Sequence, residues 1–161
     1  MKPLLLTLSL FTALALPMLA SAHEPERQPA AAQPSDAAAP AIAIVEAFST
    51  ALKAGDLAKA GAYLAEDVLI LESGGAEHSR QEYLSGHANH DAAFLKDAQI
   101  DLKQRVARME GDIAWIGTES ELRATVNGAP VALMSTESMV LKRMPTGWRI
   151  VHIHWSSSPK R

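Results

Sequence analysis

Two carboxylates and two histidines, all in segments with a strand pattern, are the side chains of this sequence best suited to chemistry. Glu72 ends the run VLILE and shares one strand face with Val68 and Ile70, because alternate residues of a strand point to the same side. A carboxylate against apolar surface has a raised pKa and can act as a general base. Glu72 is therefore the candidate catalytic residue.

His152 and His154 are two residues apart in the strand-like run WRIVHIHWSSS. Both imidazoles therefore lie on one side of the strand, roughly 7 Å apart along the backbone. Such pairs occur in metal sites, but a site needs further ligands, which would have to come from Glu119, Glu121 or His78. We expect no metal site, and we assign both histidines to the wall of the sheet or to a dimer contact.

The length of the turn between the last two strands determines which residues stand opposite one another and share a face. If residues 145–147 form a three-residue turn, Trp155 lies opposite Glu137 and His154 lies opposite Ser138, and opposed residues share a face. A slip of one residue would exchange the two faces. The face away from the histidines is then a largely apolar wall with one carboxylate, formed by Leu133, Ser135, Glu137, Met139, Leu141, Ile153 and Trp155.

The segments that position these residues are helices first and strands afterwards. Apolar residues at helical spacing predict a helix from Ala41 to about Gly55 and a second helix after Asp56. A short strand over residues 68–72 follows, and then a helix that begins with the capping box of Ser79 and Glu82. Further along that region His87, His90 and Asp91 fall at helical spacing, which indicates a solvated face or a pocket rim.

From residue 100 onwards the apolar pattern alternates as in strands. Turn-forming residues divide it into runs near 100–109, 113–126, 131–144 and 148–157. Helices followed by such a meander predict an α+β domain, with the helices on one face of a curved antiparallel sheet. Its concave side is expected to hold the core and any pocket.

Composition limits the class of protein. The chain has 15 Lys and Arg against 18 Asp and Glu, a formal net charge of −3, so it lacks the basic balance that nucleic-acid binding needs. It has no cysteine, and its stability must come from a hydrophobic core rather than from disulfides.

The first residues predict export. Residues 1–22 combine one positive charge, an apolar run and the ending Ala20-Ser21-Ala22, which is typical of a secretory signal peptide. The apolar run is shorter than the ~20 residues of a membrane-spanning helix, so we expect cleavage before His23, no membrane anchor, and a periplasmic or secreted protein. Residues 23–40, rich in Pro and Ala, predict a disordered linker, and residues 41–161 predict one domain.

The order of elements also carries a resemblance. The segment ALKAGDLAKAGAYLAEDVLILE, a capped helix and the terminal GWRIVHIHWS resemble the SnoaL-like branch of the NTF2-like superfamily over roughly residues 41–158. The resemblance implies a cone of helices wrapped by a bent sheet, often dimeric through the sheet. Aligned with ketosteroid isomerase, Glu72 takes the place of its general-base Asp and Phe48 that of its oxyanion tyrosine. Phe48 has no donor, and losing one costs ~10²- to 10³-fold in rate, which argues against isomerase chemistry.

The terminal strand also resembles the association domain of calcium/calmodulin-dependent kinase, which belongs to the same superfamily and ends in a similar W-x-x-V-H-F-H-x-S pattern. This resemblance implies that Val151, Ile153 and Trp155 face the pocket. It places His152 and His154 on the convex face, where sheet dimers meet.

These observations favour a binding protein over an enzyme. We expect a homodimer whose cone holds a small apolar or amphipathic molecule, without cofactor or metal. Two alternatives stay open: an isomerase- or cyclase-like enzyme with Glu72 as general base, and a dimeric structural or metal-binding protein that uses surface histidines. The expected pocket residues are Phe48, Tyr63, Ser135, Glu137, Met139, Ile153 and Trp155.

Overall fold

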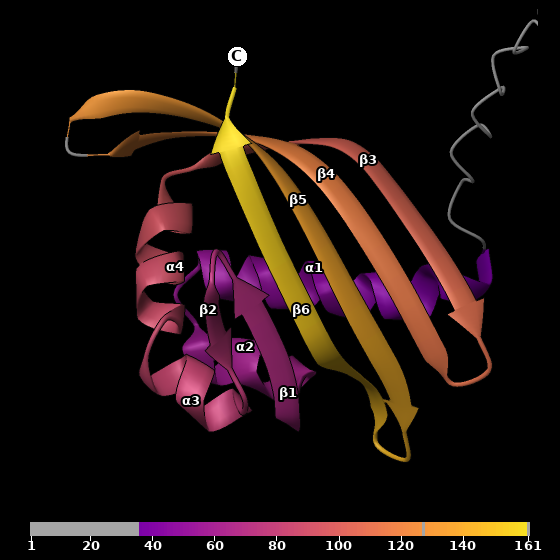
Figure 1. Cartoon of the computed structure of the whole chain (residues 1–161). Helices are drawn as coiled ribbons and strands as arrows, with labels where there is room; N and C mark the ends of the chain where they lie inside the picture. Colours follow the sequence, from indigo (N-terminus) through magenta and orange to yellow (C-terminus); the bar gives the residue numbers. More distant parts are fainter. Residues whose placement is uncertain (1–35, 127, 161) are drawn as a thin grey trace, which may run out of the picture.

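The domain consists of helices packed on the concave side of a curved six-stranded sheet (Figure 1). The structure is a computed structural model that describes residues 36–126 and 128–160. The signal peptide and the larger part of the linker predicted before residue 41 lie outside the described residues. No helix within the described ranges has the length and apolar character needed to cross a membrane.

The helical region begins earlier than the sequence pattern indicated. A 3₁₀ turn, η1 (Asp36–Ala38), leads directly into α1 (Ala39–Lys53), so residues 36–40 are not part of a disordered linker. Ala38 is fully buried, and a proline in the first turn of α1 suits a position where no backbone N–H is needed. Because the start of the helical region is buried, these residues belong to the folded domain, although composition alone assigned them to the linker.

Three shorter helices follow, two of which begin with the expected caps. Helix α2 (Leu57–Tyr63) starts at Asp56, whose side chain accepts from Lys59 N at 3.0 Å. Helix α3 (Arg80–Ser85) starts at Ser79, whose hydroxyl accepts from Glu82 N at 3.1 Å. Helix α4 (Ala88–Lys96) has no side-chain cap. The predicted capping box is confirmed at the Ser79 hydroxyl.

The sheet contains the predicted meander and one parallel addition. Strands β3 (Gln99–Glu110), β4 (Ile113–Val126), β5 (Ala129–Met144) and β6 (Gly147–Pro159) pair antiparallel in sequence order. Strand β1 (Leu64–Glu72) pairs parallel with β6, and β2 (Gly75–Glu77) pairs antiparallel with β1 at the edge. The sheet is therefore mixed, which corrects the expectation of an antiparallel one.

The predicted register of β5 and β6 is confirmed in the second half of β6, where Glu137 pairs with Trp155 and Ser138 with His154. The expected three-residue turn is wrong, because Met144 pairs with Gly147 and leaves only residues 145 and 146 between the strands.

A β-bulge in β6 reconciles these two observations. Leu141 pairs with Ile150 and Val140 pairs with His152, so Val151 is the extra residue. Before the bulge the inward residues are Trp148 and Ile150, and after it they are Ile153 and Trp155. Val151 is only partly buried, so its predicted place on the pocket face is wrong; the fully buried Ile150 holds that position.

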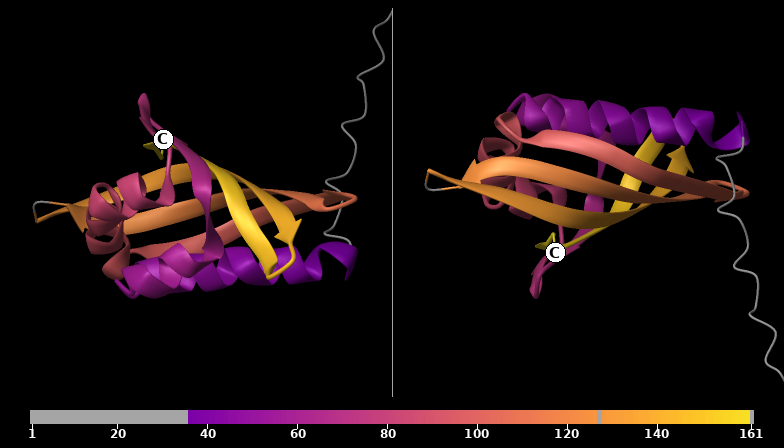
Figure 2. Two further views of the ribbon diagram at one scale, coloured as in Figure 1. Left: turned by 90° about the horizontal axis from the view of Figure 1, so that it is seen from below. Right: turned by 90° about the horizontal axis from the view of Figure 1, so that it is seen from above.

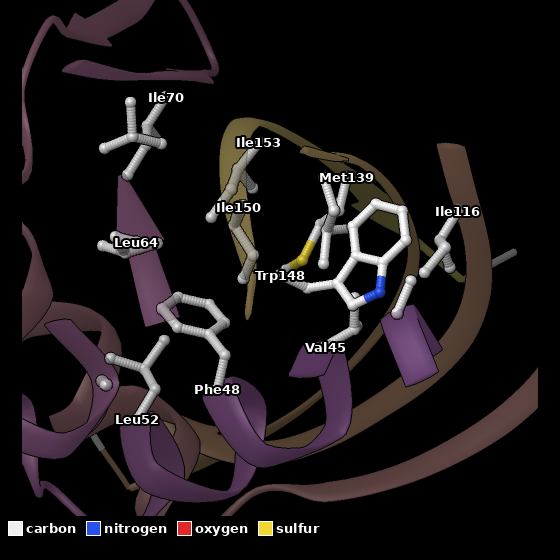
Figure 3. Packing of buried hydrophobic residues seen from close by; sticks show 14 of the residues in the cluster. Val45, Phe48, Leu52, Leu64, Ile70, Ile116, Met139, Trp148, Ile150 and Ile153 are labelled. Atoms are coloured by element: carbon white, nitrogen blue, oxygen red, sulfur yellow. The ribbon is translucent and has the colours of Figure 1, made fainter. Parts of the chain in front are cut away.

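The core lies between α1 and the concave face of the sheet, along which α1 runs (Figure 2). Val45, Phe48 and Leu52 of α1 are almost completely buried and point at the sheet (Figure 3). They meet a layer of apolar side chains from five strands. Members of this layer that stand directly opposite one another across the sheet are Ala107, Ile116, Met139, Ile153 and Ile70.

Candidate functional site

A cavity of about 260 Å³ lies beside this core, between the helices and the concave face. Its helical wall is formed by Phe48, Ser49 and Leu52 of α1 and by Asp91, Phe94 and Leu95 of α4. The opposite wall is the half of the sheet that contains the end of β1 and the start of β3. The cavity thus occupies the place expected for a pocket in this fold.

The sheet wall is layered by strand register. One transverse row crosses five strands with each residue opposite the next, and every member lines the cavity: Arg105, Thr118, Glu137, Trp155 and Glu72. We call this set the polar row. It lies next to the apolar row of the core, because residues two apart in a strand share a face.

Farther from the core the wall changes character twice. Ser120, Ser135 and Ser157 stand opposite one another and present hydroxyl groups. Ile100, Leu122 and Leu133 form the next row, and Ile100 is 46% exposed at the rim. The cavity therefore has an apolar floor, a polar middle and an apolar rim.

Glu137 is held inside the polar row by its neighbour. Trp155 Nε1 donates to Glu137 Oε2 at 2.8 Å. Burial raises the pKa of the Glu137 carboxyl, and this effect is opposed by the Trp155 donor and by the Arg105 charge. The hydrogen bond also orients the indole, whose ring stacks on Phe48 with 6.4 Å between ring centroids.

Glu72 and Asp91 bring two carboxyl groups to the α4 side of the cavity. The pKa of Glu72 is raised by burial and then by the charge of Asp91, while His87 lowers it. The pKa of Asp91 is likewise raised by burial, and a hydrogen bond from Tyr83 opposes that rise. In that bond the Tyr83 hydroxyl donates to Asp91 Oδ2 at 2.8 Å.

A third carboxylate, Glu77 of β2, stands behind this pair. It is only 5% exposed, its Oε1 contacts His87 Nδ1, and its Oε2 is buried without a partner. The contact raises the pKa of His87. We call Glu72, Glu77 and Asp91 the acidic end of the cavity.

The structure places five of the eight sequence-predicted site residues at the cavity and three outside its lining. Glu72, Phe48, Ser135, Glu137 and Trp155 line it. Met139 and Ile153 are fully buried in the core row, one layer below. Tyr63 ends α2 and packs against the core cluster, because the chain turns into β1 at Leu64.

Sequence reasoning did not identify Tyr83, Arg105 and Thr118. Tyr83 is fully buried, and its ring lies 6.1 Å from the Trp155 ring, beside the cavity where Tyr63 was expected to contribute. Arg105 Nη1 donates to Glu46 Oε1 at 2.6 Å, whereas Arg105 Nε and Thr118 Oγ1 are buried without partners. Strand alternation can give the face of Arg105 and Thr118, but only the register across the sheet shows that they line up with Glu137.

The histidines of β6 are on the side opposite the cavity. His152 Nδ1 donates to the Leu69 carbonyl oxygen of β1 at 2.9 Å, and His154 is exposed opposite Ser138. Within the described part of the chain, no three His, Asp or Glu side chains are placed to hold a metal ion. His152 and His154 thus lie in the wall of the sheet, on the side away from the cavity.

Comparison with known proteins agrees with this architecture. The family model described as "SnoaL-like domain" matches residues 42–159. Among solved structures, a candidate ketosteroid isomerase from Shewanella frigidimarina NCIMB 400 is 35% identical, with a TM-score of 0.69, over 71% of this chain and 92% of that one. No curated protein matches the chain significantly.

Two more distant structures share the fold alone. A CaMKII hub from S. rosetta is 17% identical with a TM-score of 0.67, over 78% of this chain and 100% of that one. A candidate dehydratase of the NTF2-like family from Streptomyces avermitilis is 18% identical with a TM-score of 0.65, over 80% of this chain and 99% of that one.

Proposed function

This chain belongs to the SnoaL-like domain family of the NTF2-like superfamily, and we propose that its cone binds one small amphipathic molecule. The observation that carries the proposal is the layered cavity, in which a polar row lies between an apolar floor and an apolar rim. A molecule with a polar group on a compact apolar body matches this order of layers.

The size of the cavity limits the occupant. Its 260 Å³ lies just below the roughly 300–1,000 Å³ that is usual for ligand pockets. The occupant is therefore smaller than a drug-sized molecule, and a body of two fused rings is a suitable scale. Apolar contact would come from Phe48, Phe94 and Leu95, and hydrogen bonds from the polar row and its adjacent serines.

Binding is favoured over catalysis at this site because of Phe48. Its ring is fully buried and stacked on Trp155, where it offers no hydrogen-bond donor to a developing negative charge. A second candidate function, acid–base catalysis of the isomerase or cyclase kind with Glu72 as base, is favoured by one observation. The pKa of Glu72 is raised, and its neighbour Asp91 is a second carboxyl group able to exchange a proton.

Native mass spectrometry tests the binding function. The protein, purified from its source under non-denaturing conditions, is expected to carry an excess mass of one small molecule that is released on denaturation. A spectrum with only the bare chain, together with no binding of any compound from a library of bicyclic alcohols, amines and acids, would contradict the proposal. Turnover of a library compound that is abolished by Glu72→Gln would instead establish the acid–base alternative.

The proposal includes export to the periplasm or medium and assembly as a homodimer through the convex face of the sheet. Ile113 and Trp115 of β4 are 40% and 38% exposed on that face, and Val140, opposite Trp115, is partly buried. We expect light scattering to report a dimer at tens of micromolar and Trp115→Glu to yield monomers of unchanged circular dichroism. Intact-mass measurement of the envelope protein tests for removal of residues 1–22.

A further inference from the structure

The acidic end holds more negative than positive charge at the surface of the cavity. Glu72 from β1 and Asp91 from α4 both line the cavity. Glu77 stands opposite the inward-pointing Ile70, and opposed residues of a strand pair share a face, so its carboxylate is directed to the same inner side. Its Oε2 is buried and has no hydrogen-bond partner.

The nearby cations offset only part of this charge, and His90 of α4 is one of them because it lowers the pKa of Asp91. His87 contacts Glu77 through Nδ1 and offsets the charge of that carboxylate, but neither residue is part of the cavity lining, where the carboxyl groups of Glu72 and Asp91 remain. Arg105 lines the cavity from β3, at the far end of the polar row from Glu72 on β1, and its guanidinium donates to Glu46. The carboxylates of the acidic end therefore repel one another in the empty cavity, and a bound cation would relieve that repulsion.

Aromatic rings stand next to these carboxylates. Trp155 is the direct strand neighbour of Glu72, and its ring centroid lies 6.4 Å from that of Phe48 and 6.1 Å from that of Tyr83. The face of an aromatic ring attracts an ammonium group, most strongly for tryptophan. Carboxylates beside an indole are the combination that recognises organic cations rather than anions.

A metal ion is a poor match for the same place. In residues 36–126 and 128–160 no three acidic or histidine side chains are arranged to ligate one ion. Apolar side chains from α1 and α4 also cover the cavity, and a bare ion would leave that surface without contact.

We propose that the ligand of this cavity carries a protonated amine, which binds at the acidic end against Trp155 while the apolar body lies toward Leu95 and Leu133. The inference rests on the proposed ligand-binding function and adds the charge class of the ligand. The amine donates to the carboxylates of Glu72 and Asp91, which both line the cavity.

Isothermal titration with three probes of equal shape tests the charge class. The probes are 2-(aminomethyl)naphthalene, 2-naphthalenemethanol and 2-naphthoate at pH 7.5, where the first is a cation, the second neutral and the third an anion. Because a hydrogen bond to a charged group is worth more than a neutral one, we expect the amine to bind about tenfold tighter than the alcohol, with the carboxylate the weakest.

Variants assign the effect to the acidic end. Glu72→Gln and Asp91→Asn are each expected to weaken the amine about tenfold while they change the alcohol by less than about threefold. The matched control is Glu119→Gln, an exposed residue of β4 on the convex face, which should change neither.

The outcomes separate the two proposals. Tightest binding of the amine, lost in the two acidic-end variants, supports the inference. Tightest binding of the alcohol or the carboxylate overturns the charge class and leaves the ligand-binding function standing. If none of the three probes binds to the folded protein, the ligand-binding function and the charge class both fail for ligands of this size.

Discussion

Replacement of Thr118 by valine is expected to make the empty domain more stable. Thr118 stands in the polar row on β4, is 8% exposed, and its Oγ1 is buried. The hydroxyl faces Glu137 and lowers the pKa of that carboxyl, but no hydrogen bond of normal geometry joins the two side chains. A buried hydroxyl that lost its hydrogen bonds to water and gained none in the fold lowers the free energy of unfolding. Valine has nearly the same shape and removes only the polar atom.

The size of the effect follows from that single atom. An unsatisfied buried polar group costs about 1–3 kcal/mol, and the larger methyl group can cost up to about 1 kcal/mol through tighter packing. The expected net gain is about 1 kcal/mol. A domain of about 125 residues unfolds with roughly 0.26 kcal/mol/K of entropy, so the melting temperature should rise by about 4 °C.

Urea unfolding followed by circular dichroism measures this change. The control is Thr136→Val, an exposed position on the convex face of β5, where we expect a change within about 0.5 kcal/mol. If Thr118→Val instead lowered the free energy of unfolding by 1 kcal/mol or more, the hydroxyl would be bonded in solution, with the facing Glu137 as its nearest candidate acceptor, and the reasoning would be refuted.

Three further predictions concern the same region. Tyr83→Phe removes the donor to Asp91, so it should lower the free energy of unfolding by about 1–2 kcal/mol and raise the pKa of Asp91, as measured by urea unfolding and an NMR titration. The pKa values of Glu72, Asp91 and Glu137 are raised in the fold; the folded state therefore keeps protons that the unfolded chain has lost, and stability should fall as pH rises from about 4 through these raised values. Glu137→Gln should reduce this loss of stability in thermal scans from pH 4 to pH 7. A pH profile equal to that of the wild type would contradict the raised pKa of Glu137. The double variant His152→Gln, His154→Gln should have a lower melting temperature or a weaker dimer, while its affinity for 2-naphthalenemethanol stays within a few-fold of the wild type. Tight binding of zinc or copper that is lost on either single change would contradict the assignment of these histidines to the wall of the sheet.

Local sequence pattern predicted the main helices and the four long strands, but it did not predict β2, the start of β1 at Leu64 or all of the pairings. Strand alternation and turn residues predicted β3 to β6, and the pairing of Glu137 with Trp155 is confirmed. That agreement arose from two compensating differences, a turn shorter by one residue and a bulge at Val151. A bulge leaves no clear mark in an apolar run, because each residue of such a run can be buried.

The parts of the site that the sequence pattern did not specify depend on contacts between segments far apart in the chain. Helical spacing indicated a solvated face or a pocket rim for Asp91, and the residue lines the cavity. It does so because α4 packs against α1, and its contact with Tyr83 leaves no local sequence motif. The parallel pairing of β1 with β6 brings Glu72 next to Trp155, 83 positions later in the chain, and the pattern of β1 does not specify its partner. Tyr63 was expected in the pocket, but β1 starts directly after it at Leu64 and Tyr63 is not part of the lining.

Calorimetry on a chain with a blocked cavity tests the binding function most directly. Ser135 lines the cavity from the middle of the sheet wall, so Ser135→Trp should fill it, whereas Thr136→Trp adds the same side chain to the convex face. We predict one site per chain for 2-naphthalenemethanol in the wild type and in Thr136→Trp, and no binding to Ser135→Trp of unchanged circular dichroism. Equal affinity in all three proteins, or no binding to the wild type, would contradict a ligand site inside the cone.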